Sequence, residues 1–293
     1  MNKVSEAFQK CRQEGRKAFI PFLAAGDGGL QASLTALKIL DDAGADIIEI
    51  GVPFSDPIAD GPIIQAGYQR ALERQVSLRA TLGALQRIRL RAPLLLFTYL
   101  NPVLQLALRW GRSGNGRVQD PEVLEAGLRR LARTLVRSGV GGILISDLTP
   151  EEARVYRHAF ASGGIDTVFL AAPTTTEARI RKILPVCSGF VYLVSRTGVT
   201  GKQTRLGGEA RRQVEMVRRH SAIPIAVGFG MRTPADVARA TSLADGVVVG
   251  SAIVEKLHEL SGQRDWQKKF RRYIEAFVRA ARGGASRGAR KRH

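Results

Sequence analysis

The sequence predicts a closed barrel of eight parallel β-strands surrounded by helices, the (β/α)8 or TIM-barrel fold, in a single domain. Eight short apolar runs recur along the 293 residues, and an amphipathic stretch of helical length follows each of them. The runs are rich in Ile, Val, Leu and Phe and mostly do not alternate with polar residues, which is typical of strands buried on both faces. An open, doubly wound sheet is the alternative. The segment Ala25-Gly26-Asp27-Gly28-Gly29 after the first run lacks the glycine fingerprint which that fold requires.

Strands and helices can be assigned in order along the chain. The predicted strands are Phe19–Ala24, Asp46–Gly51, Leu94–Tyr99, Gly142–Asp147, Thr167–Ala171, Gly189–Val194, Ile223–Val227 and Gly246–Gly250. Predicted helices include Gln31–Ala43, which ends at Gly44, and Pro121–Ser138. Two further helix starts are indicated by a proline with acidic neighbours, at Pro150-Glu151-Glu152 and at Thr233-Pro234-Ala235-Asp236.

Two segments fall outside this rhythm. We predict that residues 1–281 form the barrel and that the polar, basic stretch Arg109–Asp120 is an insertion loop within it. The segment 282–293 is basic and has no apolar periodicity, so we expect it to be disordered.

Composition excludes several classes of protein. No apolar run is long enough for a membrane span, and the first ten residues do not have the pattern of a signal peptide. With only Cys11 and Cys187, a disulfide framework is not expected, and we predict a cytoplasmic location. The net charge of +19 is spread over many arginines without interleaved aromatic residues, which favours a basic surface over a nucleic-acid site.

Chemistry in this fold lies at the carboxyl ends of the strands, where Glu49 interrupts an apolar run. Burial in an apolar barrel mouth would raise the pKa of its carboxyl and suit it to general acid catalysis. An outward orientation at a strand–helix seam, with an arginine as partner, is the structural alternative.

The loop after this strand contains Asp60, directly before Gly61-Pro62. Asp60 could cap the following helix, but a proline-rich loop over the barrel mouth favours a functional role.

Glycines after the sixth, seventh and eighth strands predict a phosphate site. Backbone N–H groups can approach an anion closely there, and the start of a helix adds its dipole. The segments are Gly198-Val199-Thr200-Gly201, Gly228-Phe229-Gly230 and Gly250-Ser251. No metal site is predicted, because His158, His220, His258 and His293 lack ligand spacing. Cys187, among apolar neighbours, is expected to pack rather than to react.

Several motifs, in order, resemble the tryptophan synthase alpha chain family. The most specific one runs from Glu49 to Gln65 (EIGVPFSDPIADGPIIQ). The others are Phe19–Asp27, Phe97–Pro102, Tyr192–Gly201, Gly228–Gly230 and Gly250–Val254, and together they span the chain from about Phe19 to Leu260.

The resemblance implies a carbon–carbon lyase of tryptophan biosynthesis that cleaves indole-3-glycerol phosphate to indole and glyceraldehyde 3-phosphate. It implies that Glu49 protonates indole C3 and that Asp60 accepts the indole N–H and stabilises positive charge on the ring. Tyr192 would lie beside the acid, and Thr200 would contact Asp60 when the sixth loop closes. It further implies two groups of binding residues: Phe22 and Leu100 for the indole, and Gly201, Phe229, Gly230, Gly250 and Ser251 for the phosphate.

The resemblance also implies a partner. Family members assemble with a beta chain into an αββα heterotetramer, and that beta chain carries pyridoxal phosphate, whereas no cofactor is expected in this chain. Asp56 and the stretch around Asn101 and Pro102 match segments that face the partner. The chain departs from the family pattern at Asp27-Gly28-Gly29, at Ser146 before Asp147, and in the Arg109–Asp120 stretch. These departures bear on the partner contact and on loop motion.

Two other functions remain open from the sequence. One is a barrel that releases indole without a partner or acts on a different phosphorylated substrate. The other is a catalytically silent barrel whose basic tail binds nucleic acid. Retention of both Glu49 and Asp60 favours the lyase, because a silent barrel has no use for two desolvated carboxylates.

Overall fold

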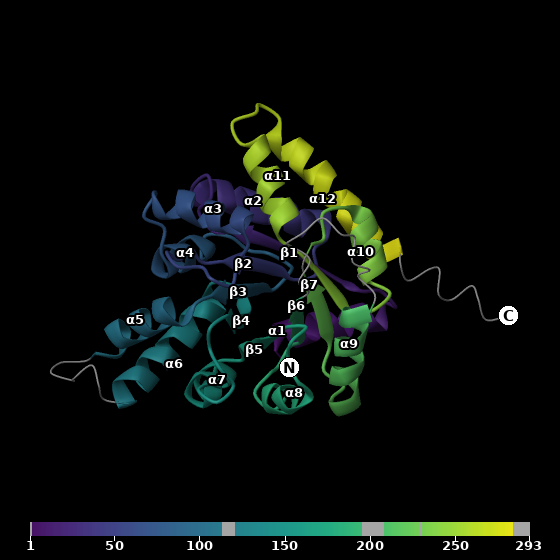
Figure 1. The fold of residues 1–293 in the computed structure, drawn as a ribbon. Coiled ribbons are helices and arrows are strands. Elements are labelled where there is room, and N and C mark those ends of the chain that lie inside the picture. Colours follow the sequence, from purple (N-terminus) through teal and green to yellow (C-terminus); the bar gives the residue numbers. More distant parts are fainter. Residues whose placement is uncertain (1, 113–120, 195–207, 229, 284–293) are drawn as a thin grey trace.

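The computed structural model confirms the predicted barrel (Figure 1). It describes residues 2–112, 121–194, 208–228 and 230–283. Eight parallel strands close on themselves in chain order, with β1 paired to β8. Each strand end lies within two residues of its predicted position, and the strands are β1 (Ala18–Ala24), β2 (Ile48–Gly51), β3 (Leu94–Thr98), β4 (Val140–Ile145), β5 (Asp166–Ala171), β6 (Val191–Val194), β7 (Ile225–Gly228) and β8 (Gly246–Val249).

Helices surround the strands on the outside (Figure 1). They are α1 (Lys3–Gln13), α2 (Leu30–Ala43), α3 (Pro62–Leu72), α4 (Leu78–Leu85), α5 (Leu100–Gly111), α6 (Pro121–Arg137), α7 (Ala153–Ser162), α8 (Glu177–Ile183), α9 (Gly208–His220), α10 (Pro234–Ala240), α11 (Ser251–Leu260) and α12 (Trp266–Gly283). The predicted start of α10 is confirmed, since Thr233 and Asp236 form a capping box there. Helix α7 begins at Ala153 instead of Pro150, because Thr149–Glu152 closes a turn in which the Glu152 N–H donates to the Thr149 carbonyl.

Two apolar clusters divide the core. The larger one fills the space between the strands and the outer helices, and the smaller one fills the inside of the barrel. Successive strand residues point to opposite sides, so every strand except β2 contributes apolar side chains to both clusters. On β2, Ile48 and Ile50 pack outward, whereas Glu49 and Gly51 face the barrel interior.

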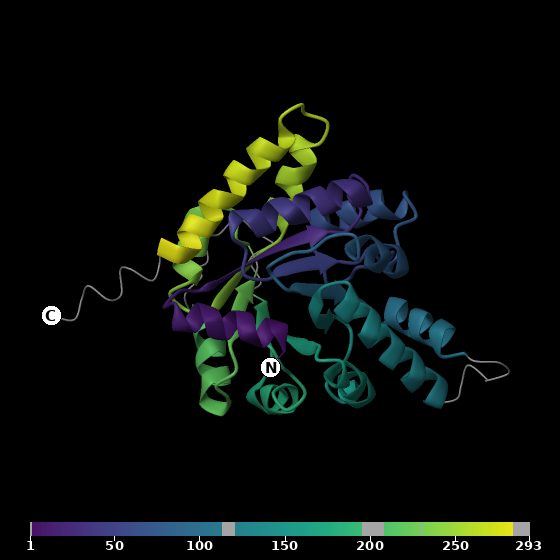
Figure 2. The same cartoon turned by 180° about the vertical axis from the view of Figure 1, so that it is seen from behind.

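Helix α1, which the sequence analysis did not predict, closes the amino-terminal end of the barrel (Figure 2). Its Phe8 ring lies 5.1 Å from the ring of Phe190 in the interior cluster. The carboxylate of Asp166, fully buried at the start of β5, accepts hydrogen bonds from the Asn2 amide and from the backbone N–H and hydroxyl of Ser5. These hydrogen bonds thus hold α1 against the amino-terminal end of the barrel.

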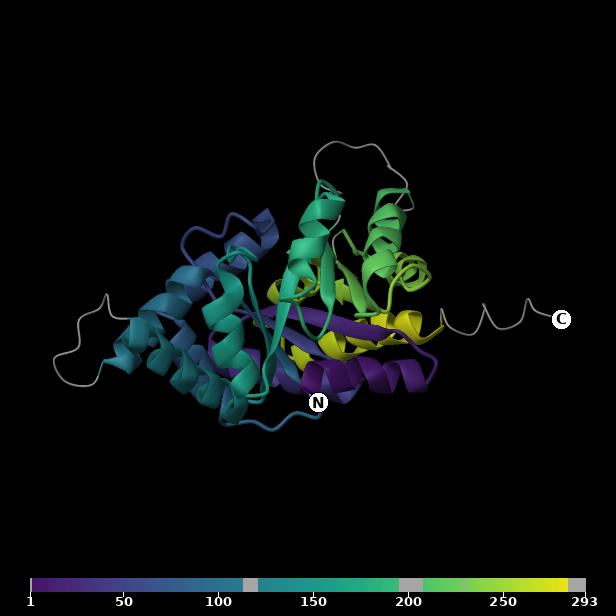
Figure 3. The same ribbon diagram turned by 90° about the horizontal axis from the view of Figure 1, so that it is seen from below.

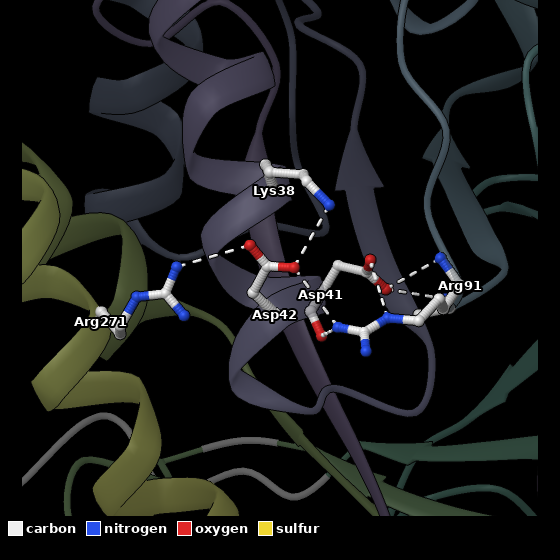
Figure 4. A network of polar contacts seen from close by, with 6 residues as sticks. Lys38, Asp41, Asp42, Arg91 and Arg271 are labelled. Atoms are coloured by element: carbon white, nitrogen blue, oxygen red, sulfur yellow. Dashed lines mark hydrogen bonds and ion pairs between the residues drawn. The ribbon is translucent and has the colours of Figure 1, made fainter.

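The carboxyl end of α2 is held by a network of charged groups (Figure 4). Asp41 is buried and accepts from the backbone N–H groups of Arg91 and Ala92, which precede β3. Its neighbour Asp42 pairs with Lys38 on the same helix and with Arg271 on α12. The network ties the first helix after β1 to both the third strand and the last helix.

Helices α5 and α6 lie side by side on one flank of the barrel (Figure 3). Arg109, Trp110 and Gly111 complete α5 rather than belonging to a loop, and the Arg130 guanidinium of α6 lies 5.4 Å from the centre of the Trp110 ring. The rest of the predicted insertion, from residue 113, lies outside the described residues. Likewise α12 includes Arg282 and Gly283, and the predicted tail beyond them is not described.

Replacing Asp166 with alanine should destabilise the barrel without changing its chemistry. The substitution leaves the partly buried donors of Asn2 and Ser5 without their acceptor, so we expect a loss of about 2 kcal/mol in the free energy of unfolding. Urea denaturation measures this loss. Glu215→Ala, on the exposed face of α9, is the control and should change stability by less than about 0.5 kcal/mol. An Asp166→Ala protein as stable as the control would contradict the proposed fastening of α1.

Candidate active site

Glu49 lies inside the barrel, near the carboxyl end of β2. Its side chain is 1% exposed, and its Oε1 atom has no hydrogen-bond partner among the described residues. No arginine of the described chain pairs with it, so the outward, paired alternative is wrong. Burial, and secondly the nearby charge of Asp60, raise the pKa of the Glu49 carboxyl from 4.5 to about 8. At neutral pH this carboxyl therefore carries a proton that it can donate.

Asp60 lies in the loop between β2 and α3 and is oriented by a tyrosine. The Tyr99 hydroxyl donates a hydrogen bond of 2.5 Å to Asp60 Oδ2, and the same hydroxyl accepts from the Ala59 N–H at 3.1 Å. The ring of Phe54 stacks on Tyr99 at 4.8 Å. Asp60 does not cap the next helix, because Gly61 occupies the capping position of α3. The helix-cap alternative is therefore wrong.

The pKa of Asp60 differs from that of Glu49 because their surroundings differ. Burial raises the pKa of Asp60 from 3.8 to about 6, while the hydrogen bond from Tyr99 acts in the opposite direction. Between pH 6 and 8, therefore, one carboxyl is protonated and the other is ionised. Such a pair can supply a proton at one point of a substrate and a negative charge at another.

Three buried tyrosines, Tyr68, Tyr99 and Tyr192, surround the two carboxyls. The positions of Tyr68 and Tyr192 depend on glycines in the strands. A Cβ atom on Gly51 would lie 2.3 Å from the Tyr68 hydroxyl, and one on Gly228 would lie 2.5 Å from the Tyr192 ring. Only glycine leaves this space free. Tyr192 faces the barrel interior, and burial, followed by the nearby Glu49 and Asp60, raises the pKa of its phenol.

Tyr68 and Tyr99 lie at the site, although neither is predicted there from the sequence. The signal for Tyr68 was present on α3, where Ile64, Tyr68 and Ala71 follow the spacing of one helix face. Tyr99 ends the third apolar run, at the end of the barrel where function was expected, but no pattern distinguished it from a core residue.

One aromatic pair forms the apolar part of the site. Phe22 is the cross-strand partner of Glu49, and its ring meets that of Phe97 edge to face at 6.0 Å. Leu100 does not join them. It is the first residue of α5, half-buried, and packs against the outer cluster. Chain direction explains the difference: Phe97 faces inward on β3, whereas the chain has turned into a helix by Leu100.

The predicted phosphate residues lie partly within the described chain. Gly230 follows β7 with φ of 65°, in the left-handed region, and Gly250 follows β8, the next strand of the barrel. Gly250 caps α11, which begins at Ser251, so the free N–H groups of that helix start face the barrel mouth. A Cβ atom on Gly250 would lie 3.7 Å from Phe22 Cβ, which places this helix start beside the apolar site. Thr200, Gly201 and Phe229 lie outside the described residues.

The cysteine and histidine side chains described next have partners away from this site. Cys187 is buried, its Sγ lies 3.1 Å from the Phe190 carbonyl oxygen, and burial raises the pKa of its thiol to about 12. His220 contacts Glu177 on the outer surface. Among the described residues, no group of His, Cys, Asp and Glu side chains is arranged to hold a metal ion. In the same part of the chain, no helix is long and apolar enough to cross a membrane.

Comparison with known proteins identifies the family. The sequence matches the profile described as tryptophan synthase alpha chain over residues 8–110 and 120–282, so residues 111–119 fall between the two matched stretches. A tryptophan synthase alpha chain of a Picosynechococcus species is 42% identical over 260 residues, covering 88% of this chain and 91% of that relative. One from Acidithiobacillus ferrooxidans is 38% identical over 292 residues, covering 99% of this chain and 100% of the relative.

Solved structures agree with the sequence comparison. A chain of Mycobacterium tuberculosis tryptophan synthase superimposes with a TM-score of 0.81 at 33% identity, covering 96% of this chain and 98% of the other. The tryptophan synthase subunit alpha of Legionella pneumophila superimposes with a TM-score of 0.80 at 28% identity, over 96% and 98% of the two chains. With its sequence matched almost from end to end and its barrel superimposed on solved members, this chain belongs to the tryptophan synthase alpha chain family.

Proposed function

We propose that this chain catalyses the retro-aldol cleavage of indole-3-glycerol phosphate to indole and glyceraldehyde 3-phosphate. The observation that supports this most strongly is Glu49, buried inside an aromatic barrel with no partner for its Oε1 among the described residues, beside the loop that carries Asp60. Burial raises the pKa of Glu49 to about 8 and that of Asp60 to about 6. The apolar face of an indole ring can pack against the Phe22 and Phe97 pair, and its N–H needs an acceptor such as Asp60.

Each proton of the reaction can be followed through these two groups. Glu49 donates its proton to indole C3, and positive charge develops on the ring nitrogen, where the Asp60 carboxylate stabilises it. The Glu49 carboxylate then accepts the proton of the hydroxyl on the carbon bonded to the ring. That C–O becomes a carbonyl, the C–C bond breaks, and its electron pair restores the aromatic indole. Glu49 ends protonated, as it began.

The substrate phosphate is proposed to bind at the mouth of the barrel. The N-terminus of α11 offers free N–H groups and the positive end of a helix dipole, next to Gly250 and Ser251. Gly230 lies at the adjacent strand end, and we propose that Thr200, Gly201 and Phe229 complete the site. Because acid–base chemistry balances every step, the proposal requires no cofactor in this chain.

We further propose that a pyridoxal-phosphate beta chain binds over the carboxyl ends of the strands, giving an αββα assembly in the cytoplasm. The loop after β2 exposes an apolar residue, Ile58, at 86%, which is unusual for a large aliphatic side chain. Asp56 on the same loop and Asn101 at the start of α5 are also exposed. A partner on this face would cover the mouth of the active site.

Glu49→Gln should abolish cleavage and leave binding nearly intact. Glutamine keeps the shape of the side chain but has no proton of suitable pKa, so kcat should fall by about 10³-fold or more while the dissociation constant for the substrate changes little. Asp60→Asn should be milder, about 10- to 100-fold, because an amide oxygen still accepts the indole N–H. Steady-state release of indole measures both. An active Glu49→Gln enzyme would refute the assignment of the acid.

The pH profile of kcat/KM should be a bell with limbs near pH 6 and pH 8. Below about 6 Asp60 is protonated and loses its charge, and above about 8 Glu49 loses its proton, so activity falls on both sides. Asp60→Asn should flatten the acidic limb and retain the basic one. The basic limb should move to lower pH in an Asp60→Asn enzyme, because the charge of Asp60 no longer helps to raise the pKa of Glu49. The reverse pattern would exchange the two assignments.

Indole release by the purified chain, with and without a beta chain, tests the partner proposal. Slow release that increases at least about tenfold with beta is expected if the two chains form one assembly. Ile58→Asp should reduce that stimulation and leave the basal rate unchanged, because an exposed apolar contact would then carry a charge. Brisk release with no response to beta would instead identify a lyase that works alone.

A further inference from the structure

Tyr68 carries a polar group for which neither the fold nor the mechanism above has a use. It is fully buried, although it comes from α3, a helix outside the barrel, and its ring belongs to the interior cluster. Its hydroxyl has no hydrogen-bond partner among the described residues. A buried donor without an acceptor is costly, and when it persists it calls for a reason.

The surroundings place this hydroxyl beside the strand that carries Glu49. It lies against the backbone of Gly51, two residues beyond Glu49 on the same face of β2, at the point where the Phe22 ring ends. Burial raises the pKa of Tyr68, and the nearby Asp60, Tyr99 and Glu49 raise it further. The hydroxyl therefore keeps its proton at neutral pH and remains a donor.

A second unsatisfied atom borders the same space. Glu49 Oε1 is buried without a hydrogen-bond partner in the described chain, and it is not within bonding distance of Tyr68. An orphaned donor and an orphaned acceptor that face one space can be satisfied together by a group that both accepts and donates. A hydroxyl group has this capacity, whereas an indole N–H can only donate and a phosphate oxygen mainly accepts.

We propose that the Tyr68 hydroxyl donates a hydrogen bond to the substrate hydroxyl on the carbon bonded to the indole ring, the hydroxyl whose proton Glu49 removes. This inference rests on the proposed function. Of the polar groups of indole-3-glycerol phosphate, the N–H belongs with Asp60 and the phosphate with α11. Of the two remaining hydroxyls, this one is bonded to the carbon next to indole C3, which Glu49 protonates.

The contact would act mainly in the transition state. As this oxygen loses its proton it gains negative charge, which persists until the carbonyl forms. A preorganised donor in a site without water stabilises such a charge more than it stabilises the neutral hydroxyl of the bound substrate. Tyr68 is thus expected to lower the barrier and to contribute little to ground-state binding.

Tyr68→Phe tests the proposal, because it removes only the hydroxyl. We expect kcat for indole-3-glycerol phosphate to fall about 10- to 100-fold with a small change in KM. The affinity for indole-3-propanol phosphate, which has the same ring and phosphate but neither glycerol hydroxyl, should stay within about twofold of the unsubstituted protein. The melting temperature should not fall, since the substitution removes an unsatisfied polar atom. Tyr156 is a buried tyrosine of the outer cluster, and Tyr156→Phe is the control. It should change neither kcat nor the affinity for indole-3-propanol phosphate.

The other outcomes decide against the proposal in distinguishable ways. Unchanged kcat in Tyr68→Phe would overturn the contact while leaving the lyase function established. An equal loss of affinity for indole-3-propanol phosphate would show that Tyr68 shapes the ring or phosphate site rather than contacting the hydroxyl. A shift of the basic limb of the pH profile, without a lower rate at the optimum, would assign Tyr68 to Glu49 instead. No cleavage by the unsubstituted chain would refute the proposed function itself, and this inference with it.

Discussion

The structure depends on the burial of one carboxyl, Glu49, inside a barrel lined with aromatic rings. Water is excluded there, and no cation of the described chain compensates a negative charge, so the neutral form is favoured. In an unfolded chain the same carboxyl would be ionised above its ordinary pKa of 4.5. Stability is therefore lost as the pH rises from that value towards 8, because the unfolded chain binds fewer protons. The fold gives up stability at neutral pH to keep an acid in its protonated form.

Asp60, the second carboxyl, is ionised at neutral pH because its surroundings differ from those of Glu49. Asp60 sits on a loop at the barrel mouth and receives a hydrogen bond from Tyr99, whereas Glu49 sits on a strand and receives none at Oε1. Both are desolvated, yet the pKa of Asp60 stays near 6 and that of Glu49 rises to about 8. Two residues of nearly the same chemistry can thus serve as anion and as acid at the same pH. The loop that orients Asp60 also exposes Ile58, so a partner bound there would act directly on the charged member of the pair.

The far end of the barrel supports this arrangement. Helix α1 closes the bottom through Asp166, which satisfies its own buried charge with donors from Asn2 and Ser5. The same kind of residue is therefore used in opposite ways at the two ends. At the bottom every oxygen of the carboxylate is bonded and the result is rigidity, while at the top an oxygen is left unbonded and available to a substrate.

The sequence by itself determined the barrel, because eight apolar runs without alternation have few other solutions. It also singled out Glu49 and Asp60 as candidate site residues, because a carboxyl within or beside such a run is unusual. It could not determine which side chains share the interior. Leu100 looked suited to the indole site, yet the chain turns into α5 there and Phe97 faces inward instead. Tyr68 reaches the site from a helix outside the barrel, through space left by Gly51 on another element. Contacts of this kind are set by the direction of each side chain in the closed barrel, which residue spacing along one segment does not specify.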